Sequence, residues 1–150
     1  MKNSKNKKLF TYMVVGDLVI ALSISCKNDE TDPNAGKFKH SDLVRTWTSV
    51  GNSFTIDSSG KVNFTYQGYT YNENILFMDM EGYDVWTSSY NNTYNPNTNP
   101  TENSERKKAN FHFSSSSSCD VTIEEQKYSG TYPNGSWQTQ NTISVGNFTK

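Results

Sequence analysis

The chain has 150 residues, with 14 Lys and Arg against 15 Asp and Glu, and a formal net charge of −1. This length suits a single domain. The charge balance excludes nucleic acid as a partner, because phosphate binding requires a basic surface.

The amino terminus has the layout of an export signal. Four lysines stand within the first eight residues, and an apolar run from Leu9 to Ile24 follows. Asp17 interrupts this run, which is also shorter than the roughly 20 apolar residues of a spanning helix. We therefore expect residues 1–25 to be removed as a signal peptide, in preference to a permanent transmembrane anchor.

Residues 1–26 resemble the signal peptides of small bacterial outer-membrane lipoproteins, because Leu22, Ser23, Ser25 and Cys26 form a relaxed, spirochaete-like lipobox. The resemblance implies cleavage between Ser25 and Cys26, with Cys26 as the N-acyl, S-diacylglycerol lipid anchor. It also implies palmitate attachment, localisation at the cell outer membrane, and contact with the membrane through this covalent lipid. The alternative is an ordinary secretory signal followed by a coincidental cysteine.

Residues 26–37 form the next segment, which we expect to be an acidic, flexible tether. It contains Asp29, Glu30 and Asp32 and shows no apolar periodicity. Residues 38–150 are then expected to form a single β domain. From residue 26 onwards there are 10 Lys and Arg against 14 Asp and Glu, hence a net charge of −4.

The first half of this domain predicts short strands separated by turns. Ser41 and Asp42 are expected to cap one helical turn, followed by a strand with a buried Trp47. Gly60 is expected to turn a hairpin, because glycine adopts a positive φ without strain. The expected strands cover residues 43–48, 54–57, 62–66, 69–71, 75–80 and 83–90, of which 75–80 is the most apolar and is predicted to be central.

The second half continues the pattern after a long polar segment. Residues 91–105 predict an exposed loop, and the serine run of residues 114–118 predicts a turn. Asn134 and Gly135 predict a tight hairpin turn. The expected strands cover residues 109–113, 119–124, 128–132, 136–140 and 142–145.

Eight to ten short strands with regularly spaced turns are typical of an antiparallel up-and-down barrel or a sandwich. Residues 43–47 and 54–62, together with the closing residues 132–139, resemble lipocalin-like lipoproteins, with Arg45 at the place of the family's glycine before Trp47. This resemblance implies an up-and-down barrel.

No catalytic, cofactor-binding or metal-binding motif is present in the sequence. His40 and His112 lack a metal-ligand spacing, and Asp79, Glu81 and Asp84 are expected to be solvated carboxylates rather than a Ca²⁺ site. Cys119 is expected to be a buried thiol, with a disulfide to Cys26 as the alternative.

We therefore expect a non-enzymatic surface lipoprotein, which displays its β domain in a structural or antigen-like interaction role. The alternative is a lipocalin-like cup for a small apolar ligand, with a cavity lined by residues such as Tyr71, Phe77 and Trp86.

Overall fold

A computed structural model of the chain describes residues 36–150. The predictions for residues 1–35, which include the signal peptide, the Ser25–Cys26 cleavage site and most of the tether, lie outside the described residues. Gly36–Lys150 forms one compact unit, and its first strand begins at Phe38.

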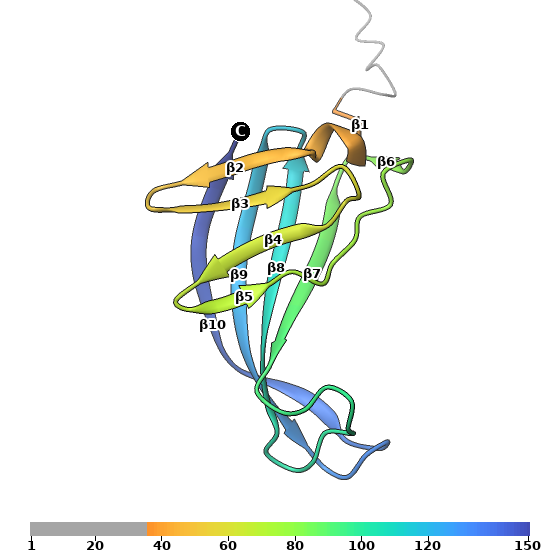
Figure 1. Ribbon diagram of the computed structural model, residues 1–150, viewed down its shortest axis with the longest axis vertical. Helices are drawn as coiled ribbons and strands as arrows, with labels where there is room; N and C mark the ends of the chain where they lie inside the picture. Colours follow the sequence, from red (N-terminus) through yellow and green to blue (C-terminus); the bar gives the residue numbers. More distant parts are fainter. Residues whose placement is uncertain (1–35) are drawn as a thin grey trace, which may run out of the picture. The chain divides into compact units, whose positions relative to one another are not determined.

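The domain is mainly β, as predicted, and consists of an eight-stranded antiparallel sheet that nearly closes into a barrel (Figure 1). Two meanders build it and meet where β10 pairs with β2. The strand order is β5-β4-β3-β2-β10-β9-β8-β7. The strands are β2 (Arg45–Ser49), β3 (Asn52–Ile56), β4 (Val62–Tyr66), β5 (Tyr69–Tyr71), β7 (Val85–Asn92), β8 (Glu105–Ser115), β9 (Ser118–Ser129) and β10 (Ser136–Thr149).

A small second sheet lies where the domain begins. Strand β1 (Phe38–Lys39) pairs with β6 (Glu81–Gly82), and the 3-10 helix η1 (His40–Leu43) follows β1. The expected helical turn at Ser41 and Asp42 is thereby confirmed. Figure 1 shows β1, η1 and β6 at one end of the domain, and the β7–β8 and β9–β10 loops at the other.

The two edge strands β5 and β7 lie side by side and are connected through side chains. The Asn91 amide donates to the carbonyl oxygen of Thr70 at 3.1 Å, and the Asn74 amide donates to the Thr87 hydroxyl at 3.0 Å. The Ser89 hydroxyl, buried in this seam, accepts a bond from the backbone N–H of Glu73 at 3.4 Å. This seam completes the barrel-like shape.

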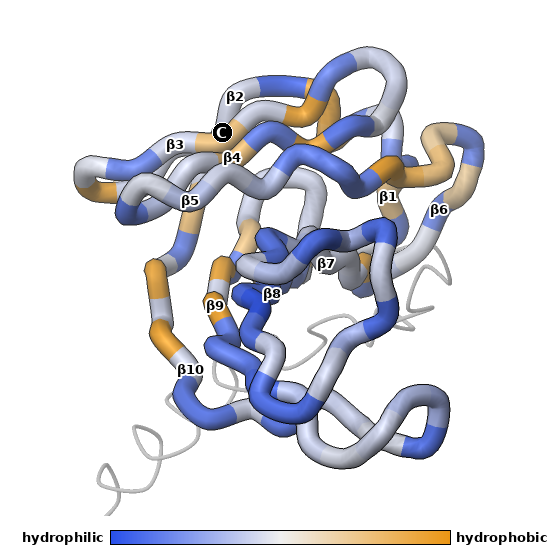
Figure 2. Tube along the Cα trace, turned by 60° about the horizontal axis from the view of Figure 1, so that its bottom comes forward, coloured by the Kyte–Doolittle hydropathy of each residue, from blue (hydrophilic) through white to orange (hydrophobic). Residues whose placement is uncertain are grey.

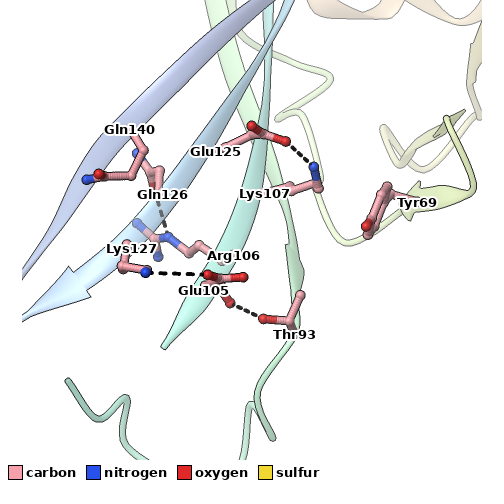
Figure 3. Close-up of a pocket in the computed structure, with 9 residues that line it drawn as sticks. All are labelled: Tyr69, Thr93, Glu105, Arg106, Lys107, Glu125, Gln126, Lys127 and Gln140. Carbon is pink, nitrogen blue, oxygen red and sulfur yellow. Dashed lines mark hydrogen bonds and ion pairs between the residues drawn. The ribbon is translucent and has the colours of Figure 1, made fainter. Parts of the chain in front are cut away.

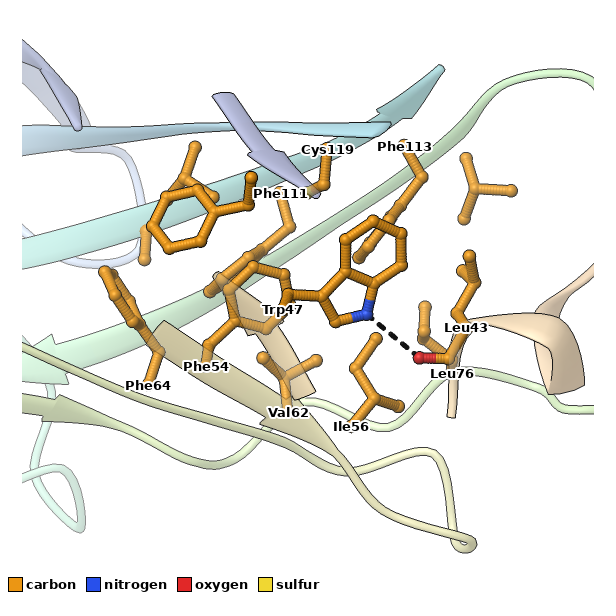
Figure 4. Close-up of a cluster of buried hydrophobic side chains, with 14 of the residues drawn as sticks. Leu43, Trp47, Phe54, Ile56, Val62, Phe64, Leu76, Phe111, Phe113 and Cys119 are labelled. Atoms are coloured by element: carbon orange, nitrogen blue, oxygen red, sulfur yellow. Dashed lines mark hydrogen bonds between the residues drawn. The ribbon is translucent and has the colours of Figure 1, made fainter. Parts of the chain in front are cut away.

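Aromatic rings fill the concave side of the sheet (Figure 4). Trp47 is fully buried, as predicted, and its ring centroid lies 5.8 Å from that of Phe54 and 5.2 Å from that of Phe113. Phe54 also packs against Phe111 at 5.1 Å and Phe148 at 5.2 Å. Rings in such offset and edge-on arrangements each bury about 150–250 Å², so they supply most of the core.

Alternation along β9 is also confirmed, because Cys119, Val121 and Ile123 all face the core. The β3–β4 hairpin turns at Gly60, whose φ is 83°. A Cβ at this position would lie 2.3 Å from the carbonyl oxygen of Leu76. Glycine is therefore required both by the turn and by the chain that crosses it.

The predicted central strand at residues 75–80 is wrong. Ile75 makes only an isolated bridge to Lys61, and the segment continues as a turn in which Met80 N–H bonds to the carbonyl oxygen of Phe77. Leu76 is buried in the core and Met78 packs against it partly buried, while Ile75, Phe77 and Met80 are exposed. The sheet edge is occupied by β5 and β7 instead, so this apolar stretch has no strand to pair with.

The last three strands are longer than predicted. β8 begins at Glu105 and continues into the serine run as far as Ser115, so only the centre of that run is a turn. β9 continues to Ser129, and the expected strands 136–140 and 142–145 are one strand, β10. β9 and β10 do form the predicted hairpin, but residues 130–135 connect them, so the tight turn expected at Asn134 and Gly135 is wrong. The positive φ of this connection lies at Gly130.

Candidate functional site

Strand length creates a polar hollow in the described domain. β8, β9 and β10 have 11, 12 and 14 residues, whereas β2, β3 and β4 have 5 each. The long strands therefore continue past the aromatic core, and their inner face changes there from apolar to charged residues.

An open pocket of about 430 Å³ occupies this extension (Figure 3). Residues of five strands or their flanks surround it, and nearly all of them are polar or charged. They are Tyr69, Thr93, Glu105, Arg106, Lys107, Glu125, Gln126, Lys127 and Gln140.

Two cross-strand ion pairs face this pocket. The register places Lys107 opposite Glu125 and Glu105 opposite Lys127. The Lys107 ammonium contacts the Glu125 carboxylate directly, and Lys127 Nζ lies 3.7 Å from Glu105 Oε1. These two ion pairs bring two positive and two negative side chains to the pocket in an alternating arrangement, beside the third cationic lining residue, Arg106. Such a lining suits a polar or zwitterionic partner and disfavours an apolar one.

The Lys107–Glu125 pair is held by further contacts. Glu125 accepts a bond from the Asn141 amide at 3.2 Å, and the Lys107 ammonium lies 4.5 Å from the centroid of the Tyr69 ring. The hydrogen bond from Lys107, with that from Asn141, lowers the pKa of Glu125. This carboxylate therefore stays ionised at neutral pH.

Tyr71 lies between the core and the pocket. Its ring stacks on Phe64 at 5.8 Å, and its buried hydroxyl makes no hydrogen bond to the described residues. Burial raises the pKa of Tyr71 to about 12. Tyr71 therefore remains a neutral phenol, with its hydroxyl buried.

The predicted loop between β7 and β8 contributes Thr93 to the rim of the pocket. It is exposed, as expected, and covers residues 93–104, since β7 continues to Asn92. Hydrogen bonds attach it to neighbouring strands: Thr93 Oγ1 donates to the carbonyl oxygen of Glu105 at 2.7 Å, and Tyr128 N–H donates to that of Ser104 at 2.8 Å. The loop is therefore fixed at both ends.

The opposite face of the same strands carries a stacked cation. The Arg106 guanidinium lies 4.4 Å from the centroid of Tyr90 and 4.2 Å from that of Trp137, and Arg106 Nε donates to Gln126 Oε1 at 2.8 Å. Burial lowers the pKa of Arg106, although it stays charged at neutral pH. Arg106 thereby ties β7, β8, β9 and β10 together from outside.

Glu124 is the hydrogen-bond centre of this outer face. Its carboxylate accepts bonds from the Asn110 amide at 2.7 Å, the Gln126 amide at 2.7 Å and the Thr139 hydroxyl at 2.9 Å. Burial alone would raise the pKa of Glu124, but the bonds from Thr139 and Asn110 outweigh it and lower the pKa. The outer face is therefore an ordered polar network.

The three carboxylates considered for Ca²⁺ have different partners. Asp84 bonds to His112 and to Trp86 Nε1, and Glu81 pairs with Lys37 at 2.5 Å. Asp79 is exposed. Within residues 36–150 no three His, Cys, Asp or Glu side chains are grouped so that they could hold a metal ion.

The remaining residues singled out from the sequence are dispersed. His112 points away from the core, as expected, and stacks on Trp86 with ring centroids 3.8 Å apart. His40 is the first residue of η1 and is buried. Tyr71 is buried, whereas Phe77 and Trp86 are exposed, so these three do not line a common cavity.

Cys119 is a free, buried thiol, as predicted. Its side chain faces the aromatic core (Figure 4). Burial raises the pKa of the thiol far above its usual range. Cys26 lies outside the described residues, so its lipid anchor stays a prediction.

Sequence reasoning missed the pocket. Its signal was present, because Glu105 and Lys107 on one segment complement Lys127 and Glu125 on the other. The complementarity only becomes meaningful once the register is known.

Comparisons with protein families, curated proteins and solved structures found no match. In residues 36–150 there is no helix with the length and apolar character needed to cross a membrane. The class defined by the structure is accordingly that of its fold: an antiparallel β domain, nearly closed into a barrel, with a charged pocket beyond its core.

Proposed function

We propose that this chain is an exported lipoprotein, held at the outer membrane by lipid on Cys26, whose β domain serves as a surface interaction module. The supporting observation is the position of the other cysteine. Cys119 is fully buried in the core, so a disulfide to Cys26 would require the core to open. Cys26 is thereby left available for acylation.

Acylation at this position suits stable attachment. One acyl chain gives only marginal membrane binding, whereas two or more hold a protein firmly. A processed Cys26 carries three chains, two on the glycerol and one on the amine. The domain itself then needs no membrane-spanning element.

The geometry of the pocket supports a binding role. It lies at the end of the sheet opposite β1, where the described domain begins (Figure 1). Glu105 and Glu125 are each paired with a lysine, which leaves neither as an obvious acid or base for catalysis. A polar partner bearing both charges could exchange ion pairs with this site.

A lipocalin-like module for a small apolar ligand is the second candidate. The strand order favours it, because the eight strands follow one another as in an up-and-down barrel. The contacts among Trp47, Phe54 and Phe113 favour the display module instead, since these rings occupy the centre of the sheet.

Metabolic labelling with palmitate tests the anchor. We expect label on the wild-type chain and none on Cys26→Ala. Cys119→Ala is the matched control, because it removes the other thiol and should keep the label. Label that persists on Cys26→Ala, or wild-type protein with a free amino terminus and thiol by mass spectrometry, would overturn the proposal.

A second measurement separates the two roles of the domain. Titration of the folded protein with a fluorescent fatty acid should give no saturable, one-to-one binding if the core is filled. Stoichiometric binding that is abolished by unfolding would favour the cup over the display module.

A further inference from the structure

Exposed apolar side chains gather in the loop between β5 and β6. Phe77 is 70% exposed, Ile75 64% and Met80 53%. Tyr83 and Trp86 follow within a few residues and are 49% and 63% exposed. Isolated exposed apolar residues are ordinary, but a concentration of them in one segment marks a contact surface. We call residues 75–86 the apolar loop; Figure 2 shows hydrophobic colour in the chain leading to β6.

The apolar loop is held in place by its backbone. Leu76 N–H bonds to the carbonyl oxygen of Gly60 at 2.8 Å, and its side chain is buried. His40 N–H bonds to the carbonyl oxygen of Met80 at 3.0 Å. Phe77 and Met80 lie at or between these attachments, and Ile75 is held by its bridge to Lys61. Their exposed side chains therefore project from a fixed frame and are not the result of a loose segment.

The apolar loop lies next to the point where the chain enters the domain. β6 lies within it and pairs with β1, with Phe38 opposite Gly82, and Lys37 contacts Glu81. Gly36, the first described residue, stands ten positions after Cys26. An extended chain spans at most ~3.6 Å per residue, so these ten positions reach no further than about 36 Å. Lipid on Cys26 would thus confine this end of the domain to the neighbourhood of a bilayer.

We propose that the apolar loop docks onto the lipid bilayer surface, with Ile75, Phe77 and Met80 inserted at the interface. This inference rests on the proposed lipid anchor and adds an orientation to it. Tyr83 and Trp86 suit the headgroup level, where amphipathic rings are enriched. The docked domain turns its charged pocket away from the membrane, towards external partners.

Charge at this surface favours apolar insertion over electrostatic attraction. Lys37 is neutralised by Glu81, and Asp84 bonds to His112. Lys39 and Asp79 are exposed with opposite signs. Docking should therefore occur on zwitterionic lipid and change little with salt, since screening affects exposed charges and not apolar burial.

Quenching by lipid-embedded nitroxide tests the orientation. The lipidated full chain is reconstituted in phosphatidylcholine vesicles that contain nitroxide-labelled phosphatidylcholine. A fluorophore is attached at Phe77→Cys or, as the matched control, at Asn97→Cys in the exposed β7–β8 loop. Cys26 is acylated and Cys119 buried, so labelling is specific. We expect several-fold stronger quenching at position 77 than at position 97.

Further variants connect the quenching to the apolar side chains. Ile75→Asp with Met80→Asp should reduce quenching at position 77 to the level at position 97, with an unchanged circular dichroism spectrum. Val50→Asp alters a residue that is 97% exposed on the β2–β3 turn and should leave quenching unchanged. Equal quenching at positions 77 and 97, in chains without the aspartate substitutions, would overturn docking. Docking would also be overturned if a second copy of the chain, and not lipid, covered the label at position 77.

A separate arm distinguishes this inference from the anchor. Full-length Cys26→Ala is held on nickel-chelating lipid through an amino-terminal histidine tag, and the same two positions are compared. Strong quenching at position 77 in this arm supports docking even if the natural chain proves to lack acyl groups. Equal quenching here, with acyl groups present on the natural chain, overturns docking and leaves the anchor intact.

Discussion

The indole Nε1 of Trp47 donates a hydrogen bond to the carbonyl oxygen of Leu43 at 3.0 Å, inside the core (Figure 4). Both residues are fully buried. This bond satisfies a carbonyl at the end of η1 that water cannot reach, so it ties the start of the domain to β2.

Trp47→Phe should destabilise the fold by about 2–4 kcal/mol, because it leaves the Leu43 carbonyl without a donor and creates a cavity among the rings. The midpoint of urea unfolding, followed by circular dichroism, measures the change. Trp86→Phe, at a ring that is mostly exposed, should shift stability by no more than about 0.5 kcal/mol. Similar losses for the two variants would contradict the assigned role of Trp47.

Arg106→Lys should cost about 1–2 kcal/mol, although the charge is kept. Lysine lacks the planar guanidinium that stacks against Tyr90 and Trp137 while bonding to Gln126. Thermal melts of the two proteins provide the comparison. Arg45→Lys, on an exposed side chain, is the control and should be nearly neutral; a neutral Arg106→Lys would mean that the stacking contributes little.

Cys119 should not react with a thiol reagent in the folded protein. Its side chain is buried, and burial raises the pKa of the thiol, so almost no thiolate is available. In full-length Cys26→Ala, Ellman's reagent should detect one thiol in urea and none in buffer. Ser117→Cys in a Cys26→Ala, Cys119→Ala background places a thiol on the exposed turn nearby and should react at once. Rapid labelling of Cys119 in buffer would show that the core opens readily.

The Glu124 network predicts a loss of stability in acid. The folded state lowers the pKa of Glu124 from its ordinary value of 4.5. Its contribution is therefore complete above pH 4.5 and is lost as the pH falls through the lowered folded value. The effect is modest, because the side chain keeps contact with solvent. Unfolding midpoints measured from pH 6 to pH 3 should fall less steeply for Glu124→Gln than for the wild type, and parallel curves would contradict this assignment.

The sequence predicted those features that depend only on neighbouring residues, such as the alternation of a strand and the glycine of a turn. The alternation of Cys119, Val121 and Ile123 gave their common face, because a strand has a side-chain period of two. Gly60 marked its hairpin, because few other residues adopt the positive φ of such a turn. Trp47 was predicted to be in the core, because a large aromatic side chain on a short strand is buried most effectively on the inner face of the sheet.

Long-range pairing was not accessible in the same way. Residues 75–80 are apolar enough for a central strand, yet a strand forms only beside another strand whose edge is unpaired. Whether such an edge is free depends on β5 and β7, which occupy the edges of the sheet, and not on residues 75–80 themselves. The ends of β8, β9 and β10 carry polar residues on both faces, which hides the alternation that would have shown their length. The pocket depends on the register of Lys107 with Glu125, and register is set by the whole sheet.

The seam between β5 and β7 is the part of the barrel that we expect to open first. Its contacts run through Asn74, Ser89 and Asn91, and a row of side-chain bonds opens at a lower free energy than a continuous backbone ladder. In deuterated buffer, amide protons of Tyr69–Tyr71 should be replaced well before those at the centre of β9. A partner strand inserted between the separated β5 and β7 would find two exposed strand edges. Each edge offers backbone N–H and carbonyl groups for pairing.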